Sequence, residues 1–117
     1  MNTETMNTEQ VSMATPVTDD TFGAVVLGSP RPVIVEYWAR WCGPCRQLGP
    51  VLDAIAADHA GRVDLVTVDT DENWLTTARY GVLHVPTVHV FAGGELVRQV
   101  VGARSKAALL RELAGVL

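Results

Sequence analysis

The sequence predicts one α/β domain in which a central mixed β-sheet carries helices on both faces. The first observation is VIVEYW, residues 33–38, which is rich in β-branched and aromatic residues and apolar on both faces, like a central strand buried between two layers. The second is the alternation of such runs with helical periodicity, since helical crossovers imply parallel strands early in the chain. The third is the Gly93-Gly94 pair between two apolar runs, which predicts a hairpin and therefore a late antiparallel pair.

The first elements of the domain are expected to be short. Residues 11–17 are expected to form an edge strand, and Asp19 or Asp20 can cap a short helix through about Val26. A Pro/Gly loop, GSPRP, then leads into the buried strand.

A longer helix follows the buried strand. It is predicted from about Pro44, because apolar residues recur at helical spacing, and it should stop at Gly61. Pro50 lies inside this helix and should kink it. Residues 63–69 then predict a strand, and residues 72–80 a short helix.

A hairpin and one helix complete the domain. VHVF and LVRQVV flank the AGGE turn and are expected to pair with each other. Ser105 begins the last helix, whose apolar side contains Leu109, Leu110 and Leu113. The predicted order of elements is therefore β-α-β-α-β-α-β-β-α.

Length and composition indicate an ordinary globular domain. A chain of 117 residues can bury a single core without disulfide staples. No unbroken apolar run approaches the roughly 18 residues that a membrane span needs, so no membrane role is expected. The net charge of −4 arises in residues 1–20, and the acids and bases that follow balance. A neutral body without a Lys/Arg cluster argues against nucleic acid as a partner.

The N-terminal segment differs in composition from the rest. Residues 1–10 are rich in Thr, Asn and Glu, so we expect a disordered tail before a domain of residues 11–117. The segment has neither a basic start nor an apolar stretch, so it does not read as a secretion signal. We therefore expect a cytoplasmic, reducing location, where a structural disulfide is not expected. The two cysteines then need a redox or a metal explanation.

Cys42 and Cys45 follow the buried strand directly, at the first turn of the long helix. Side chains three residues apart share a helix face with Cβ atoms about 5 to 6 Å apart, and a disulfide needs about 3.5 to 4.5 Å, so a small adjustment opens or closes the bond. The positive end of the helix dipole should lower the pKa of Cys42, whereas Cys45 lies a turn deeper. We expect Cys42 to attack a target disulfide and Cys45 to resolve the mixed disulfide.

The alternative for this pair is half of a zinc site. Such a site needs four ligands, and besides the two cysteines the chain offers only His59, His84 and His89, none at knuckle-like spacing. A cytosolic Cys-X-X-Cys beside a βαβ pattern indicates a redox motif, so we favour redox chemistry and expect no bound metal.

WCGPC preceded by VEYWA closely resembles the active site of the thioredoxin family. The likeness covers about residues 17–117, through TDDTF, GVLHVPTV, FAGGE and VGARSKAALL in the family's order. The resemblance implies the thioredoxin fold and a monomeric protein-disulfide reductase whose only redox group is the Cys42–Cys45 disulfide. It also implies re-reduction by thioredoxin reductase, an NADPH-dependent flavoprotein that binds the FAD, and targets of the ribonucleotide reductase or peroxiredoxin type.

The resemblance further implies a docking surface beside the cysteines. In the family the proline of the VPT motif follows a cis peptide bond, and the backbone of the preceding residue is free to pair with an extended substrate segment. The residues that would form this flat apolar surface are Trp41, Gly43, Pro44, Val85, Pro86, Gly102 and Ala103. From the residues alone, the alternatives are a packed core aromatic at position 41, an edge-strand proline at position 86 and a turn glycine at position 102.

Glu36 is the only charge in the buried strand, and alternation places it on one face with Ile34 and Trp38. An unpaired carboxylate is costly in such a place, so its pKa should rise. A buried acid of raised pKa can exchange a proton with the second cysteine when that thiol becomes the attacking group. The alternative is a structural acid paired with a water or a hydroxyl.

Two positions depart from the family's pattern. The family places a buried Asp where this chain has Glu36, and it often has a paired Lys where this chain has Thr67. Because a nearby cation favours the charged carboxylate, its loss should make Glu36 titrate higher than the Asp of such a pair.

Other readings stay open. A scaffold module of the same fold would let a partner grip the apolar surface and would need neither thiol, and intact WCGPC argues against it. A carrier that holds an iron–sulfur cluster or zinc between two chains would be isolated with metal. Trp74 is expected to be exposed on its short helix and has no assigned role.

Overall fold

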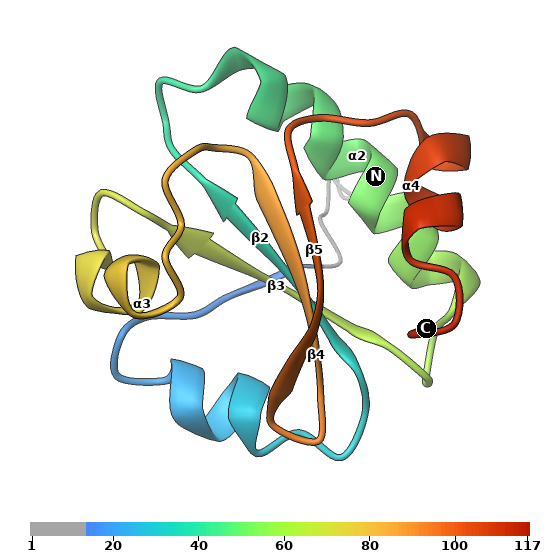
Figure 1. The fold of residues 1–117 in the computed structure, drawn as a ribbon, viewed down its shortest axis with the longest axis horizontal. Coiled ribbons are helices and arrows are strands. Elements are labelled where there is room, and N and C mark those ends of the chain that lie inside the picture. Colours follow the sequence, from blue (N-terminus) through green and yellow to red (C-terminus); the bar gives the residue numbers. More distant parts are fainter. Residues whose placement is uncertain (1–13) are drawn as a thin grey trace, which may run out of the picture.

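The computed structural model describes residues 14–117, and it has the predicted order of elements around a five-stranded sheet (Figure 1). The expected disordered tail, residues 1–10, lies outside the described residues. The elements are β1 (Thr15–Pro16), η1 (Gly23–Leu27), β2 (Val33–Trp38), α2 (Gly43–Asp58), β3 (Asp64–Asp69), α3 (Trp74–Arg79), β4 (Thr87–Ala92), β5 (Glu95–Val101) and α4 (Lys106–Glu112). None of the helices in residues 14–117 is long and apolar enough to cross a membrane.

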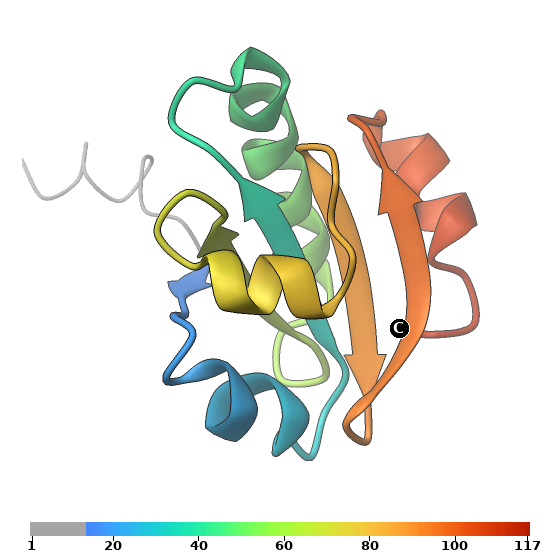
Figure 2. The same cartoon turned by 60° about the vertical axis from the view of Figure 1, so that its left-hand side comes forward.

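The sheet is mixed, as predicted, with strand order β1-β3-β2-β4-β5. β1 and β2 each pair with β3 in parallel, and β4 pairs antiparallel with both β2 and β5. Figures 1 and 2 show α2 and α4 on one face of the sheet, and α3 with the short helical turn η1 on the other. Both faces of β2 are therefore covered, which explains why its residues are apolar on both sides.

Two hydrophobic clusters fill the spaces between the layers. The cluster under α2 and α4 includes Ile34 and Leu52, and the cluster under η1 and α3 includes Tyr37 and Phe91. Alternation along β2 thus divides its side chains between the two layers as predicted. Glu36 lies on the same side of the strand as Ile34.

α2 begins at the cysteine pair because Cys42 caps it. The backbone of Cys42 is extended, with φ −91° and ψ 105°, and its sulfur accepts the N–H of Cys45 at 3.2 Å. Pro44 lies in the first turn, where a missing N–H breaks no intrahelical bond. The helix ends at Asp58, just before the chain turns at Gly61, whose φ is 82°.

The predicted cap of the first helix is wrong. The turn before η1 is closed by the Thr18 and Thr21 hydroxyls, each accepting the other residue's N–H, and no described side chain caps η1 itself. The Asp19 carboxylate instead accepts the N–H of Thr76 at 2.8 Å, and the Asp19 N–H donates to Asn73 Oδ1 at 2.9 Å. Asp19 therefore caps α3, a partner 57 residues away that local sequence spacing does not reveal.

Candidate active site

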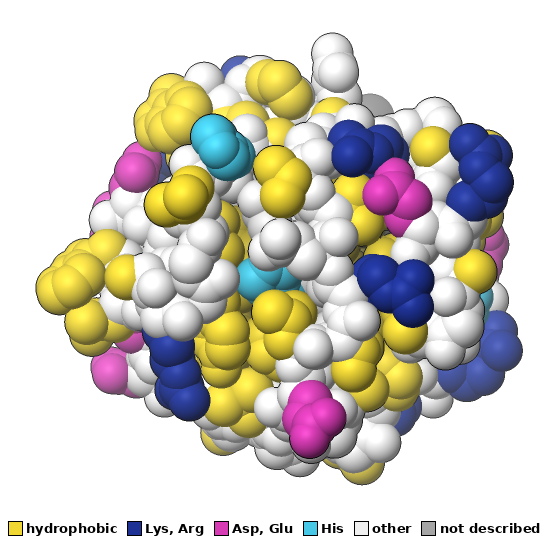
Figure 3. Space-filling view, in the orientation of Figure 1, with side chains coloured by type: hydrophobic (Ala, Val, Ile, Leu, Met, Phe, Trp, Pro, Cys, Tyr) yellow, Lys and Arg dark blue, Asp and Glu magenta, His cyan; other side chains and the backbone are white. Residues whose placement is uncertain are grey.

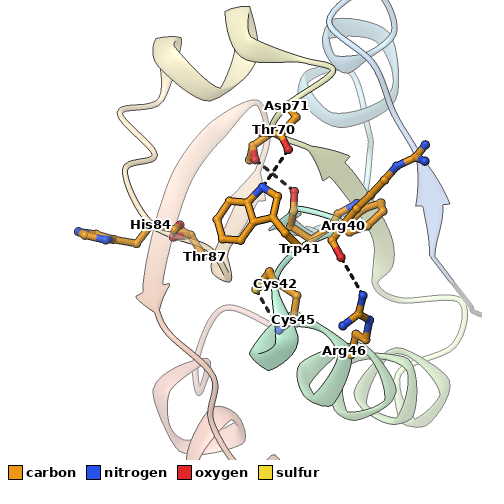
Figure 4. The surroundings of a disulfide bond; sticks show 10 residues. Arg40, Trp41, Cys42, Cys45, Arg46, Thr70, Asp71, His84 and Thr87 are labelled. Atoms are coloured by element: carbon orange, nitrogen blue, oxygen red, sulfur yellow. Dashed lines mark hydrogen bonds between the residues drawn. A yellow bond between two sulfur atoms is a disulfide. The ribbon is translucent and has the colours of Figure 1, made fainter.

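Cys42 and Cys45 form a disulfide at the N-terminal end of α2, as the spacing predicts (Figure 4). Their Cα atoms are 5.4 Å apart, and the two residues are buried. The sulfur of Cys42 accepts the amide of Cys45, so a helix-start N–H group points at it. Such an environment stabilises a thiolate on Cys42 once the bond is reduced.

The Val85–Pro86 peptide bond is cis, as expected, and Val85 packs against the cysteine pair together with Ala39. The strand β4 begins only at Thr87, so Val85 lies outside the ladder of the sheet. Its N–H and carbonyl form no hydrogen bond with any residue in 14–117. This backbone can therefore pair with an added extended segment.

The remaining residues of the expected docking surface differ in their exposure. Trp41 is 70% exposed, which is not the packing of a core aromatic, and its indole N–H donates to Asp71 at 3.0 Å. Gly43 and Pro44 are exposed beside Cys42, Pro86 is buried, and Ala103 is exposed. Gly102, whose φ is 94°, donates its N–H to the carbonyl of Pro86 at 2.8 Å.

Exposed hydrophobic side chains extend beyond the predicted surface. Figure 3 shows them gathered on the side of the molecule that carries α3 and the loop before β4, with a histidine among them. They include Trp74, as predicted, and Leu83, which is 85% exposed. Leu83 and His84 line a groove of about 340 Å³ with Trp41. Sequence reasoning missed Leu83, because a single leucine in a loop carries no periodic signal.

Glu36 is buried, and burial, followed by the negative charge of Asp53, raises its pKa to about 7. Thr67 lies directly opposite it on β3, where no cation can pair with the carboxylate. No residue in 14–117 forms a hydrogen bond or ion pair with the Glu36 carboxyl. The expectation of a raised pKa is therefore confirmed, and the alternative of a hydroxyl partner finds none among the described residues.

Glu36 and Cys45 line the same pocket, which has a volume of about 420 Å³. Trp38, the last residue of β2, is only partly buried and forms part of the wall of this pocket. Arg46 also lines it, and no sequence pattern marks that exposed helix residue. An acid and the second cysteine, the two groups that the expected proton relay requires, therefore line one pocket.

Two of the three histidines make contacts through their rings. His89 is fully buried, with hydrogen bonds to Tyr37 and Gln99, and the Nδ1 of His59 contacts the carbonyl of Ile55 at 2.8 Å. His84 is exposed. Among the described residues there is no group of three or more His, Cys, Asp or Glu side chains that could hold a metal ion.

The sequence is similar to known proteins over nearly the whole chain. The family model for thioredoxin matches residues 13–115. A thioredoxin from Streptomyces clavuligerus is 55% identical over 95 residues, covering 81% of this chain and 88% of that protein. Thioredoxin 1 from a Nostoc species is 47% identical over 103 residues, covering 88% of this chain and 96% of that protein.

A longer relative contains the same domain. The bifunctional thioredoxin reductase/thioredoxin of Mycobacterium leprae is 44% identical over 101 residues, covering 86% of this chain and 22% of that protein. Together with the matched family model and the disulfide at the helix start, these similarities assign the chain. The chain belongs to the thioredoxin family, and the Cys42–Cys45 disulfide is its redox-active centre.

Proposed function

We propose that the chain reduces disulfide bonds in other proteins, with Cys42 as the nucleophile and Cys45 as the resolving thiol. The Cys42 thiolate attacks one sulfur of the target disulfide, forms a mixed disulfide and releases the other target sulfur as a thiolate. Cys45 then attacks the Cys42 sulfur, which forms the Cys42–Cys45 disulfide and releases the reduced target. The amide that Cys45 donates to the Cys42 sulfur is the observation that carries this assignment of roles.

Targets dock on the surface formed by Trp41, Gly43, Pro44, Val85, Pro86, Gly102 and Ala103. The unpaired N–H and carbonyl of Val85 support pairing with an extended target segment beside the cysteines. Exposed Trp41 supplies apolar contact area next to the reactive sulfur. An extended segment with an apolar side chain beside its disulfide is the class of target that this surface suits.

Glu36 acts as the proton acceptor for Cys45 when that thiol attacks the mixed disulfide. Two observations support this role: the pKa of Glu36 is raised to about 7 by burial and by Asp53, and Glu36 shares a pocket with Cys45. The pH profile of disulfide reduction by Glu36→Gln tests it. A shifted profile between pH 6 and 9 supports the relay, and a profile that overlays wild type rejects it.

The reduced state is restored by a thioredoxin reductase, which brings the NADPH and FAD that this chain does not bind. The Mycobacterium leprae relative, whose name joins a thioredoxin reductase to a thioredoxin, supports this pairing. Targets are of the ribonucleotide reductase or peroxiredoxin type. The protein acts as a monomer in the cytoplasm, where the reducing glutathione pool keeps a dithiol reductant in its reduced form.

The test is NADPH-dependent reduction of a model protein disulfide in the presence of a thioredoxin reductase. We expect turnover with wild type and none with the Cys42→Ser, Cys45→Ser double variant. Lack of turnover by wild type would overturn the proposal. If the double variant still supported the function of a protein that binds this chain, the chain would act as a scaffold module that needs neither thiol.

A further inference from the structure

The pocket of about 420 Å³ beside Glu36, termed the Glu36 pocket, has the size of a small-molecule site, for which about 300 to 1,000 Å³ is typical. Cys45 lines it, as do Arg40 and Arg46. In Figure 4 these arginines lie on one side of the disulfide and His84, which lines the groove beside Trp41, lies on the other. None of the residues that line the Glu36 pocket belongs to the docking surface, so the pocket reaches Cys45 separately from that surface.

The buried wall of this pocket contains an acid without a partner. Glu36 is 5% exposed, and its carboxyl has no hydrogen bond or ion pair within residues 14–117. Buried polar groups are nearly always paired, so this carboxyl is available to a molecule that enters the pocket. Thr67, opposite Glu36 in the sheet, lines the pocket as well, and its short side chain leaves the space open.

The mouth of the pocket is positively charged. The Arg46 Nη2 donates to the Arg40 carbonyl at 2.8 Å, and its other N–H groups have no acceptor among the described residues. The Arg40 side chain is 81% exposed, with its Nε 3.9 Å from the Asp69 carboxylate. Trp38 supplies an apolar wall. A guanidinium held in this way is suited to bind a carboxylate.

We propose that the Glu36 pocket admits a low-molecular-weight thiol that carries a carboxylate, and that this thiol attacks the sulfur of Cys45. The arginines bind the carboxylate, and the Glu36 carboxylate takes the proton of the incoming thiol. The thiolate forms a bond to the Cys45 sulfur, the Cys42–Cys45 bond breaks, and Cys42 leaves as a thiolate. A second small thiol, after losing its proton to solvent, attacks the small sulfur of the mixed disulfide. Cys45 leaves and takes the proton from Glu36, and the two small thiols depart as their disulfide.

The choice of Cys45 as the attacked sulfur follows from the leaving group. Exchange is faster when the departing thiol has the lower pKa, and attack at Cys45 expels Cys42, whose sulfur already accepts a helix-start amide. Cys45 lines the pocket and Cys42 does not, so a molecule in the pocket meets the favoured sulfur. The inference rests on the redox role of the pair and adds a second route by which it exchanges electrons.

The test uses the full chain with Cys42→Ser, which leaves Cys45 as the only thiol. Its rate of mixed-disulfide formation is measured by mass spectrometry with three small probes: 3,3′-dithiodipropionate, hydroxyethyl disulfide and cystamine, which are anionic, neutral and cationic. In this background Arg46→Gln should slow the anionic probe about five-fold relative to the neutral one, because it removes one close opposite charge. Any change in the pKa of Cys45 affects all three probes alike and cancels in their ratios.

Arg111→Gln is the matched control, since Arg111 is an exposed arginine at the end of α4 that does not line the pocket. It should leave every ratio unchanged. If Arg46→Gln slows the three probes by the same factor, the arginine acts only on the thiol and the proposal is wrong.

A second pair of variants tests access through the pocket. Thr67→Met places a longer side chain in the open space and should slow all three probes about ten-fold, whereas Thr67→Val keeps the volume and should not. Circular dichroism confirms that both variants fold. Equal rates in both variants would show that the probes reach Cys45 by another path. These rates do not depend on turnover of the reductase assay. If the reductase assay failed while Cys45 still reacted through the pocket, the proposed function would be rejected and this inference would stand.

Discussion

Glu36 and His89 are two buried titratable residues on adjacent strands, and they lie on opposite faces of the sheet. In the β2–β4 register Glu36 is opposite Val88 and His89 is opposite Val35. His89 has a partner at both ring nitrogens, whereas Glu36 has none within residues 14–117 and faces a pocket. Burial alone therefore does not mark a functional group. We expect the presence or absence of partners to separate a structural residue from a reactive one.

The partners of His89 define its state. Its Nε2–H donates to the Gln99 side-chain oxygen at 2.8 Å, and its Nδ1 accepts from the Tyr37 hydroxyl at 3.2 Å. The rings of Tyr37, Tyr80 and Phe91 surround it at centroid distances of 4.9, 6.4 and 6.0 Å. Burial lowers the pKa of His89, so the folded protein favours the neutral imidazole ring.

The largest expected effect is the loss of stability in His89→Ala. Removing a fully buried ring leaves a cavity and strands the Tyr37 hydroxyl, so we expect a cost of about 3 to 4 kcal/mol in the free energy of unfolding. Urea denaturation measures it. Turnover of the folded protein should stay within about two-fold of wild type. A large loss of turnover without a loss of stability would show that His89 has a functional role, and the contrast between a structural His89 and a functional Glu36 would be wrong.

Glu36→Gln should stabilise the protein at high pH. The folded-state pKa of Glu36 is raised from 4.5 to about 7, so its contribution to stability is complete below pH 4.5 and is lost as pH rises through 7. Glutamine avoids this loss, and the expected gain is about 2 to 3 kcal/mol at pH 8.5. At pH 4 the two proteins should unfold at similar urea concentrations. A gain that is equal at both pH values would show that ionisation is not its cause.

Tyr37→Phe should have a smaller effect, confined to stability. It removes the donor to His89 Nδ1 and leaves a buried acceptor unpaired, which costs about 1 to 2 kcal/mol. Phe91→Leu is a control for packing in the same cluster, because it removes ring area without touching a hydrogen bond. If Tyr37→Phe changed the pH profile of turnover and Phe91→Leu did not, the hydrogen bond on the His89 face of the sheet would influence the Glu36 site on the other face.

The smallest expected effect is the change in stability that accompanies the titration of His89. It is measured in the Glu36→Gln variant, because Glu36 would otherwise change the stability with pH in the opposite direction. Because the folded-state pKa of His89 is lowered, the unfolded chain binds more protons below pH 6.5, and stability should fall as pH falls through that value. Chemical denaturation at pH 7.5, 6 and 5 measures the slope. A flat profile would mean that His89 keeps its ordinary pKa when folded.

Much of the fold followed from periodicity, and the exceptions depend on tertiary contacts. VIVEYW predicted the central strand because helices cover both faces of that strand, so adjacent residues of one segment are all apolar except Glu36. The placement of β4 against β2 and the cap that Asp19 supplies to α3 join residues far apart in sequence. No local pattern encodes such pairings.

The site divides in the same way. The disulfide between Cys42 and Cys45 was predictable from their spacing, and the raised pKa of Glu36 from one charge in an apolar strand. The cis bond before Pro86 was predictable only from the resemblance of its motif to the thioredoxin family. The pocket beside Glu36 was not predictable, because its walls come from β1, β2, β3 and α2 together. The roles of the docking residues stay predictions.

The cap that Asp19 provides has a consequence for the order in which the native state opens. α3 has six residues, too few to be stable alone, and the amide of Thr76 near its start is held by a carboxylate from the N-terminal part of the domain. Detaching the segment around Asp19 and fraying α3 are therefore one event rather than two. Hydrogen exchange at the Thr76 amide would report the docking of that segment, and proteolytic nicking near Asp19 would loosen the helix that leads to the Val85 loop.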